Sequence, residues 1–137
     1  MDVSDLILAD YAAANPGGKF TLVGAGITNI NAKRIPCVQP LMFLLVRLKV
    51  TRQDIGLNKI EIRLVGDKGI IFKADVDMQV KPEHNEEQHL PAVIQMVNTK
   101  FEEFGTYNFE VSINGDVKSS QILTIRQEPQ PAQASSS

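Results

Sequence analysis

Hydrophobic and polar residues alternate over most of this chain, which is the pattern of half-buried β-strands. No segment keeps a helical period long enough to predict a long helix, so folds that join parallel strands by crossover helices are disfavoured. Short clusters of turn residues separate the alternating segments. Strands are predicted at residues 20–27, 41–51, 59–65, 70–80, 92–97, 107–113 and 119–126.

Residues 5–14 fit either a strand or a helix, because the segment is rich in leucine and alanine. The segment ends at Asn15-Pro16-Gly17-Gly18, a strong turn signal. With or without this segment, we expect an all-β fold: an antiparallel two-sheet immunoglobulin-like β-sandwich of about seven or eight strands.

Two hairpins are the best-marked local elements of the chain. Asp67-Lys68-Gly69 joins the strands of residues 59–65 and 70–80, and Asn114-Gly115 is a type I′ signal between the last two strands. Tyr107, just after Gly105, fits a tyrosine corner of the immunoglobulin-like kind, or it is simply the first inward residue of its strand. Both interpretations give the same fold class.

The connections carry weaker signals. Gly24-Ala25-Gly26 predicts a strand bulge or a close backbone approach, since a phosphate-binding loop would need a third glycine and a following helix. Residues 29–39 are predicted to be a loop, and residues 52–58 a connection with one helical turn. The apolar run 41–46 predicts a buried central strand and is far too short to cross a bilayer.

The length of 137 residues predicts one domain, residues 1–126, followed by a flexible polar tail, residues 127–137. Cys37 is the only cysteine, which fits a reducing compartment. The acidic start lacks the features of a secretory signal, so we expect a cytoplasmic protein, or a virion component if a phage encodes it. A net charge of −2 disfavours nucleic acid as a partner, and we expect no membrane partner.

Three short motifs carry a resemblance: Leu8-Ala9-Asp10, then Gly18-Lys19 leading into residues 22–26, and finally Gly105-Thr106-Tyr107-Asn108-Phe109. With the proline-bounded apolar strand between them, they resemble an uncharacterised family of small proteins from bacteria and their phages, a domain of unknown function. The resemblance spans about residues 6–126. It implies a β-sandwich and supplies no catalytic residues.

Candidate catalytic and metal-binding groups are few. His84 and His89 share a polar loop, residues 81–89, with three glutamates, Glu83, Glu86 and Glu87. Imidazole and carboxylate groups could bind a divalent ion, but a solvated loop explains them without a ligand. Cys37 lacks an adjacent charge that would activate its thiol. The serines lack a nucleophile-elbow sequence around them; they are Ser4, Ser112, Ser119 and Ser120.

Charged residues on the strands give two weaker candidates. Asp75 and Asp77 point outward, opposite Glu61 and Arg63, and could help to hold Ca²⁺, although alternating charge on a wet face is the commoner cause. Five basic residues could form a partly basic outer face of one sheet and so a docking surface; they are Arg47, Lys49, Lys59, Arg63 and Lys73.

We therefore expect no enzyme, no cofactor and no metal, and a non-catalytic protein-interaction or structural module, one form of which is a component of an oligomeric or phage-particle assembly. A protein partner, or further copies of the chain, would contact strand edges, loops or the tail. The alternatives are a small-ligand-binding sandwich, and a hydrolase or metal-dependent enzyme that uses Cys37 or the loop of residues 81–89.

Overall fold

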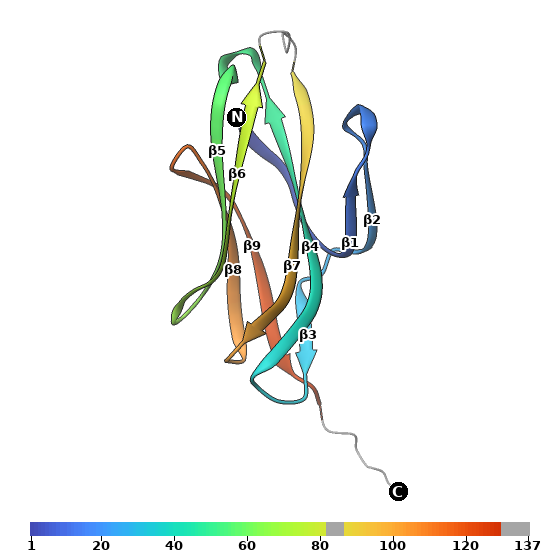
Figure 1. Cartoon of the computed structure of the whole chain (residues 1–137). Coiled ribbons are helices and arrows are strands. Elements are labelled where there is room, and N and C mark those ends of the chain that lie inside the picture. The colour runs from blue at the N-terminus through green and yellow to red at the C-terminus, as the bar shows by residue number, and fades with distance from the viewer. Residues whose placement is uncertain (82–86, 130–137) are drawn as a thin grey trace, which may run out of the picture.

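The computed structural model describes residues 1–81 and 87–129, and its described part is a two-layer β-sandwich (Figure 1). The expected all-β class is confirmed. The described strands are β1 (Asp2–Ala14), β2 (Phe20–Ala25), β3 (Asn29–Ala32), β4 (Cys37–Val50), β5 (Gly56–Gly66), β6 (Gly69–Val80), β7 (Gln88–Phe101), β8 (Gly105–Ile113) and β9 (Asp116–Gln127).

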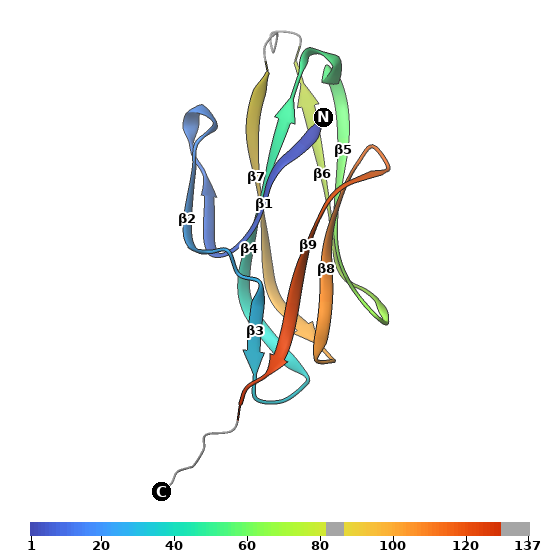
Figure 2. The same cartoon turned by 180° about the vertical axis from the view of Figure 1, so that it is seen from behind.

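The strands form two sheets, with the orders β2-β1-β4-β7 and β3-β9-β8-β5-β6. All described pairs are antiparallel except β3 and β9, which run parallel. Figures 1 and 2 show the molecule from opposite sides, with β6 and β7 bordering one side and β1, β9 and β3 the other. Contacts of β7 with β6 and of β1 with β9 agree with this alignment of the layers.

The core lies between the two sheets and consists of every second side chain along the strands, those that point inward. Leu44 and Val46 from β4 face Ile62 of β5 and Phe109 of β8, and all four side chains are fully buried. The central position of β4, between β1 and β7, confirms the interpretation of residues 41–46 as a buried central strand.

The first segment is a strand throughout, which settles its ambiguity. Its first part pairs with β4 as far as Ala9, and its second part leaves that ladder and pairs with β2. This hairpin, residues 10–25, is called the arm below. It folds back along the outer surface of its own sheet (Figures 1 and 2), and its tip reaches His89 at the start of β7.

The arm explains why β4 is apolar on both faces. Phe43 and Leu45 point away from the core, yet both are buried. The ring of Tyr11 meets that of Phe43 edge-on, with 5.2 Å between centroids, and the Arg47 guanidinium lies 5.8 Å from the ring centroid of Phe20. The arm therefore adds a partial third layer over this sheet.

Two glycines allow the arm to close against β1. Gly24 and Gly26 both have positive φ, and the backbone N–H of Gly26 donates to the carbonyl of Leu8 at 2.9 Å. A Cβ on Gly24 would overlap the carboxyl group of Asp10. The expected close backbone approach at residues 24–26 is confirmed.

The predicted turns are also confirmed. Asn114 and Gly115 both have positive φ, as a type I′ turn requires, and residues 67 and 68 form the loop between β5 and β6. Residues 52–54 form a single 3₁₀ turn. The Tyr107 hydroxyl donates to the carbonyl of Glu103 at 3.0 Å and accepts from its N–H at 3.3 Å, which is the hydrogen bonding of a tyrosine corner.

Several boundaries were predicted wrongly. The described part has nine strands, because residues 29–32 pair with β9 instead of forming a loop. Cys37 is the half-buried first residue of β4 and not a loop residue. Strand β7 begins at Gln88, because its ladder with β4 continues past Pro91. Most of the predicted tail, from residue 130 onward, lies outside the described residues, and Gln127 ends β9.

Candidate functional site

The acidic loop of residues 81–89 is described only in part. His84, Glu83 and Glu86 lie outside the described residues. His89 lies at the start of β7, where its Nε2 is 3.6 Å from a carboxylate oxygen of Glu87. The described residues contain no group of three or more His, Cys, Asp or Glu side chains placed to hold a metal ion.

His89 also lies beside Ser4, so a serine, a histidine and a carboxylate follow one another on the surface. The Nδ1 atom of His89 is 3.2 Å from the Ser4 hydroxyl, and this hydroxyl donates to the carbonyl of Arg47 at 3.1 Å. The Ser4 hydroxyl thus donates its only proton to that carbonyl, whereas a general base needs the serine to donate to the histidine.

The remaining nucleophile candidates lie on strands β4, β8 and β9. Cys37, at the start of β4, pairs in the ladder with Phe101. Ser112 is buried, and Ser119 and Ser120 are on β9 at the ladder positions of Val111 and Glu110. None of these side chains makes a hydrogen bond to a base among the described residues.

The carboxylates of β6 lie on the outer surface of the β3-β9-β8-β5-β6 sheet. Asp75 is opposite Glu61, as expected, but Asp77 is opposite Lys59 and not Arg63. With Ser112 and Val117 they line an open surface groove of about 580 Å³.

Ion pairs dominate the same surface. Arg63 contacts Glu110 at 2.9 Å and Glu61 at 3.4 Å, and Lys73 contacts Glu61 at 3.1 Å. The five basic residues do not share one face as predicted: Lys59, Arg63 and Lys73 are on this sheet, whereas Arg47 and Lys49 are on the other sheet. Sequence spacing could not reveal this, because β4 and β5 belong to different layers.

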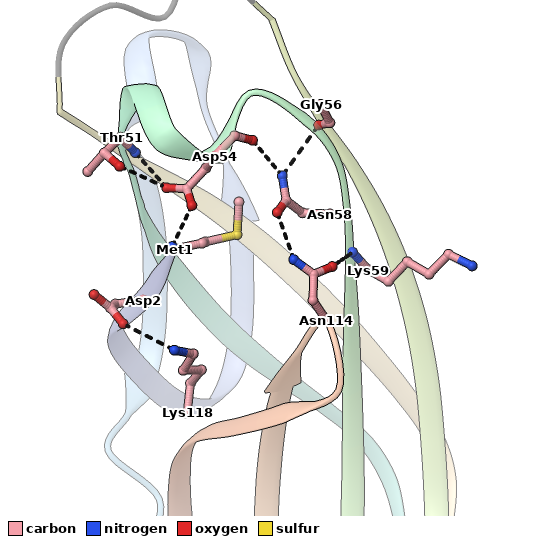
Figure 3. Close-up of polar contacts among 9 residues, drawn as sticks. All are labelled: Met1, Asp2, Thr51, Asp54, Gly56, Asn58, Lys59, Asn114 and Lys118. Carbon is pink, nitrogen blue, oxygen red and sulfur yellow. Dashed lines mark hydrogen bonds and ion pairs between the residues drawn. The ribbon is translucent and has the colours of Figure 1, made fainter.

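A polar network orders one end of the sandwich, as Figure 3 shows. The amino group of Met1 donates to one Asp54 oxygen at 2.6 Å, and the N–H and hydroxyl of Thr51 donate to the other. Only 11% of the Asp54 side chain is exposed. Burial raises the pKa of this carboxyl, but the hydrogen bonds from Met1 and Thr51 outweigh it and lower the pKa below its usual 3.8.

Asn58 and Asn114 extend this network to the last hairpin (Figure 3). Asn58 is buried, and its amide group donates to the carbonyl of Asp54 at 2.7 Å. Its side-chain oxygen accepts from Asn114 at 2.9 Å, and the Asn114 oxygen accepts from the Lys59 N–H at 2.9 Å. Because each group has a partner within the chain, the network serves to fix the loops at this end.

The outer surface of the β2-β1-β4-β7 sheet is apolar where the arm leaves it uncovered. Tyr11 is opposite Val23 in the ladder of the arm, and Leu41 is opposite Val97 in the ladder of β4 and β7. The ring of Tyr11 contacts Phe43, which lies two residues after Leu41 on β4. The exposed members of this group are called the apolar patch: Tyr11, Val23, Leu41 and Val97, with exposed fractions of 41–60%. Exposed apolar side chains that gather on one surface mark interaction sites.

The patch continues to a free strand edge. Strand β7 pairs with β4 on one side, and no described strand pairs with its other side. Residues 88–99 contain no Asp, Glu, Lys or Arg. Natural sheets usually protect long edges with charges, prolines or bulges. Pro91 and Asn98 lie near the ends of β7, and Asn98 has a positive φ, so Ala92–Val97 remains as a regular uncharged stretch between them.

The sequence carried a signal for this edge that was missed, namely the uncharged stretch itself. Which strand forms an edge depends on the order of strands in the sheet, however, and no local sequence pattern predicts that order.

The fold and these surfaces define a two-layer β-sandwich, whose described residues include no cluster of three or more metal-ligating side chains. A family model described as a family of unknown function (DUF6941) matches residues 4–126, and the chain belongs to that family. Curated proteins gave no match to the chain. Among the described residues, no helix is long and apolar enough to span a membrane.

Proposed function

We propose that this chain is a non-catalytic protein-interaction module, whose partner is a protein that docks on the apolar patch. The single observation that carries the proposal is the exposure of Tyr11, Val23, Leu41 and Val97 on the arm and on strands β4 and β7, beside an uncharged strand edge. A partner of matching apolar surface would remove these side chains from water. A structural role in an oligomeric or phage-particle assembly is one form of such a module.

We also propose that the sandwich is immunoglobulin-like. In that fold one sheet holds strands A, B and E, and the other holds C, F and G, with a further strand beside C in variable-type domains. Taking β1, β4 and β7 as A, B and E makes β5, β6, β8 and β9 the strands C, C′, F and G. Tyr107 at the start of β8 agrees with the position of the tyrosine corner.

The alternatives have less support. A small-ligand carrier needs a cavity between the sheets, whereas Leu44, Ile62 and Phe109 there are fully buried in side-chain contact. A hydrolase would need a nucleophile that donates to its base, and the Ser4 hydroxyl donates to a backbone carbonyl instead.

Site-specific photo-crosslinking tests the interaction proposal. A benzophenone side chain is placed at Val23, within the patch, and at Ile122, on the opposite sheet; both positions are 56% exposed. In the native cells we expect a discrete adduct from position 23 and none from position 122. The protein in the adduct should bind the purified chain saturably, and Val23→Lys should weaken that binding at least tenfold.

Equal adducts from both positions, or none from position 23, would contradict the proposal. A crosslinked protein whose binding to the purified chain is unaffected by Val23→Lys would contradict it as well.

A further inference from the structure

We propose that a second copy of the chain joins the first by antiparallel pairing of the two β7 edges, which lie beside the apolar patch. This inference goes beyond the proposed function, because the contact is made along the strand edge and leaves the patch free for another protein. The contact would extend the β2-β1-β4-β7 sheet across a two-fold axis into one continuous sheet.

Strand β7 is the described edge best suited to such pairing. The edges β2 and β3 have only six and four residues. Strand β6 is twelve residues long, but Lys73, Asp75 and Asp77 make it a charged edge. Strand β7 has fourteen residues, and its stretch Ala92–Val97 has neither a charge nor a proline. A strand of this kind presents unpaired N–H and C=O groups to another chain.

The inner face of β6 supplies a second reason. Its inward residues Phe72, Ala74, Val76 and Met78 are only partly buried, whereas the inward residues of β5 are fully buried. Strands β6 and β7 border the same side of the sandwich (Figure 1). A two-fold axis that pairs the β7 edges also brings the two β6 strands together, so these half-covered side chains would be covered by their counterparts.

The available area agrees with a two-fold contact. The uncharged stretch is bounded by Glu87, which is paired with Lys49, and by Lys100, which is paired with Glu102, so these flanking charges are balanced within each copy. The side of the sandwich that β7 borders is fourteen residues long, at about 3.4 Å per residue, and about 10 Å wide between the two layers. Its area is therefore about 480 Å² per copy. The two copies would cover about 1,000 Å² in total, the lower limit for a specific interface.

Light scattering coupled to size exclusion tests the inference on the full chain. We expect a concentration-dependent mass that approaches twice the 15.1 kDa of one chain. Val97→Lys and Gln95→Lys each place a charge on the edge strand and should raise the dissociation constant at least tenfold. Circular dichroism of both variants checks that they remain folded, as expected for exposed positions.

Val117→Lys is the matched control, because Val117 is 57% exposed and Val97 is 60% exposed, on opposite sheets. It should leave the dissociation constant unchanged. Amide hydrogen exchange should slow in Ala92–Val97 as concentration rises.

A chain that stays at 15.1 kDa up to high micromolar concentration would overturn the inference, as would a dimer that Val117→Lys disrupts as strongly as Val97→Lys. In either case a different protein crosslinked at Val23 would leave the proposed function standing, so the two failures are distinguishable.

Discussion

Removing the hydroxyl of Tyr107 tests whether the corner between β7 and β8 stabilises the fold. The ring of Tyr107 is buried and meets the ring of Phe101 edge-on, with 5.0 Å between centroids. Tyr107→Phe keeps this ring contact and the ring's close approach to Gly66. The substitution therefore removes only the two hydrogen bonds to the backbone of Glu103.

The expected loss follows from those two bonds. A protein hydrogen bond contributes about 0.5–1.5 kcal/mol net, and a donor or acceptor left without a partner costs more where it is buried. The bond to the Glu103 carbonyl is 3.0 Å and the bond from its N–H is 3.3 Å, so the second is the weaker. We expect Tyr107→Phe to lower the free energy of unfolding by about 1.5 kcal/mol.

Urea denaturation followed by circular dichroism measures this loss. With a slope of about 1.5 kcal/mol per molar urea, the midpoint should fall by about 1 M. The other tyrosine provides the control: Tyr11 is 47% exposed, and its hydroxyl makes no hydrogen bond to a described residue. If Tyr107→Phe and Tyr11→Phe differ by less than about 0.5 kcal/mol, the hydrogen bonds do not stabilise the corner.

Three further substitutions test the network and the arm. Asp54→Asn should destabilise the chain by about 2 kcal/mol near neutral pH, because it leaves the Met1 amino group without its carboxylate. Since the folded pKa of Asp54 lies below the unfolded value, its stabilisation is present above about pH 4 and is lost as the pH falls through the folded pKa; the gap between wild type and variant in urea midpoints should close there. A gap that persists at low pH would refute this linkage. Gly24→Ala should cost about 1–3 kcal/mol in thermal unfolding, because φ is positive and the new Cβ meets Asp10, and a neutral result would show that the arm can shift. Asn58→Ala should cost about 2–3 kcal/mol in urea unfolding, because it leaves buried groups unpaired, and a loss below about 0.5 kcal/mol would mean that water replaces the side chain.

Much of the fold could be predicted because the decisive signals are local. Period-2 alternation marked the strands that have one face on the core, and Asn114-Gly115 marked a turn that needs positive φ at both residues. The tyrosine corner was predictable as one of two options, since a tyrosine four residues after Glu103 can reach that residue's backbone. Such features depend on residues close together along the chain.

The candidate surface was harder to predict. The prediction that Arg47 and Arg63 share one face failed for a physical reason: Arg47 is on β4 and Arg63 is on β5, and the chain crosses from one sheet to the other between these consecutive strands. The patch combines residues of β1, β2, β4 and β7, and only the fold of the arm decides which of their side chains remain exposed.

The sequence by itself determined that this chain is an all-β domain with defined hairpins, because side-chain alternation and turn chemistry act within a few residues. Only the tertiary structure decided that β3 pairs in parallel with β9, that the arm covers Leu45 and leaves Val97 exposed, and that β7 forms an edge. These outcomes depend on contacts between segments that are distant in the sequence. Alternative pairings of such segments differ in free energy over the whole fold, so no short stretch of sequence reveals which pairing forms.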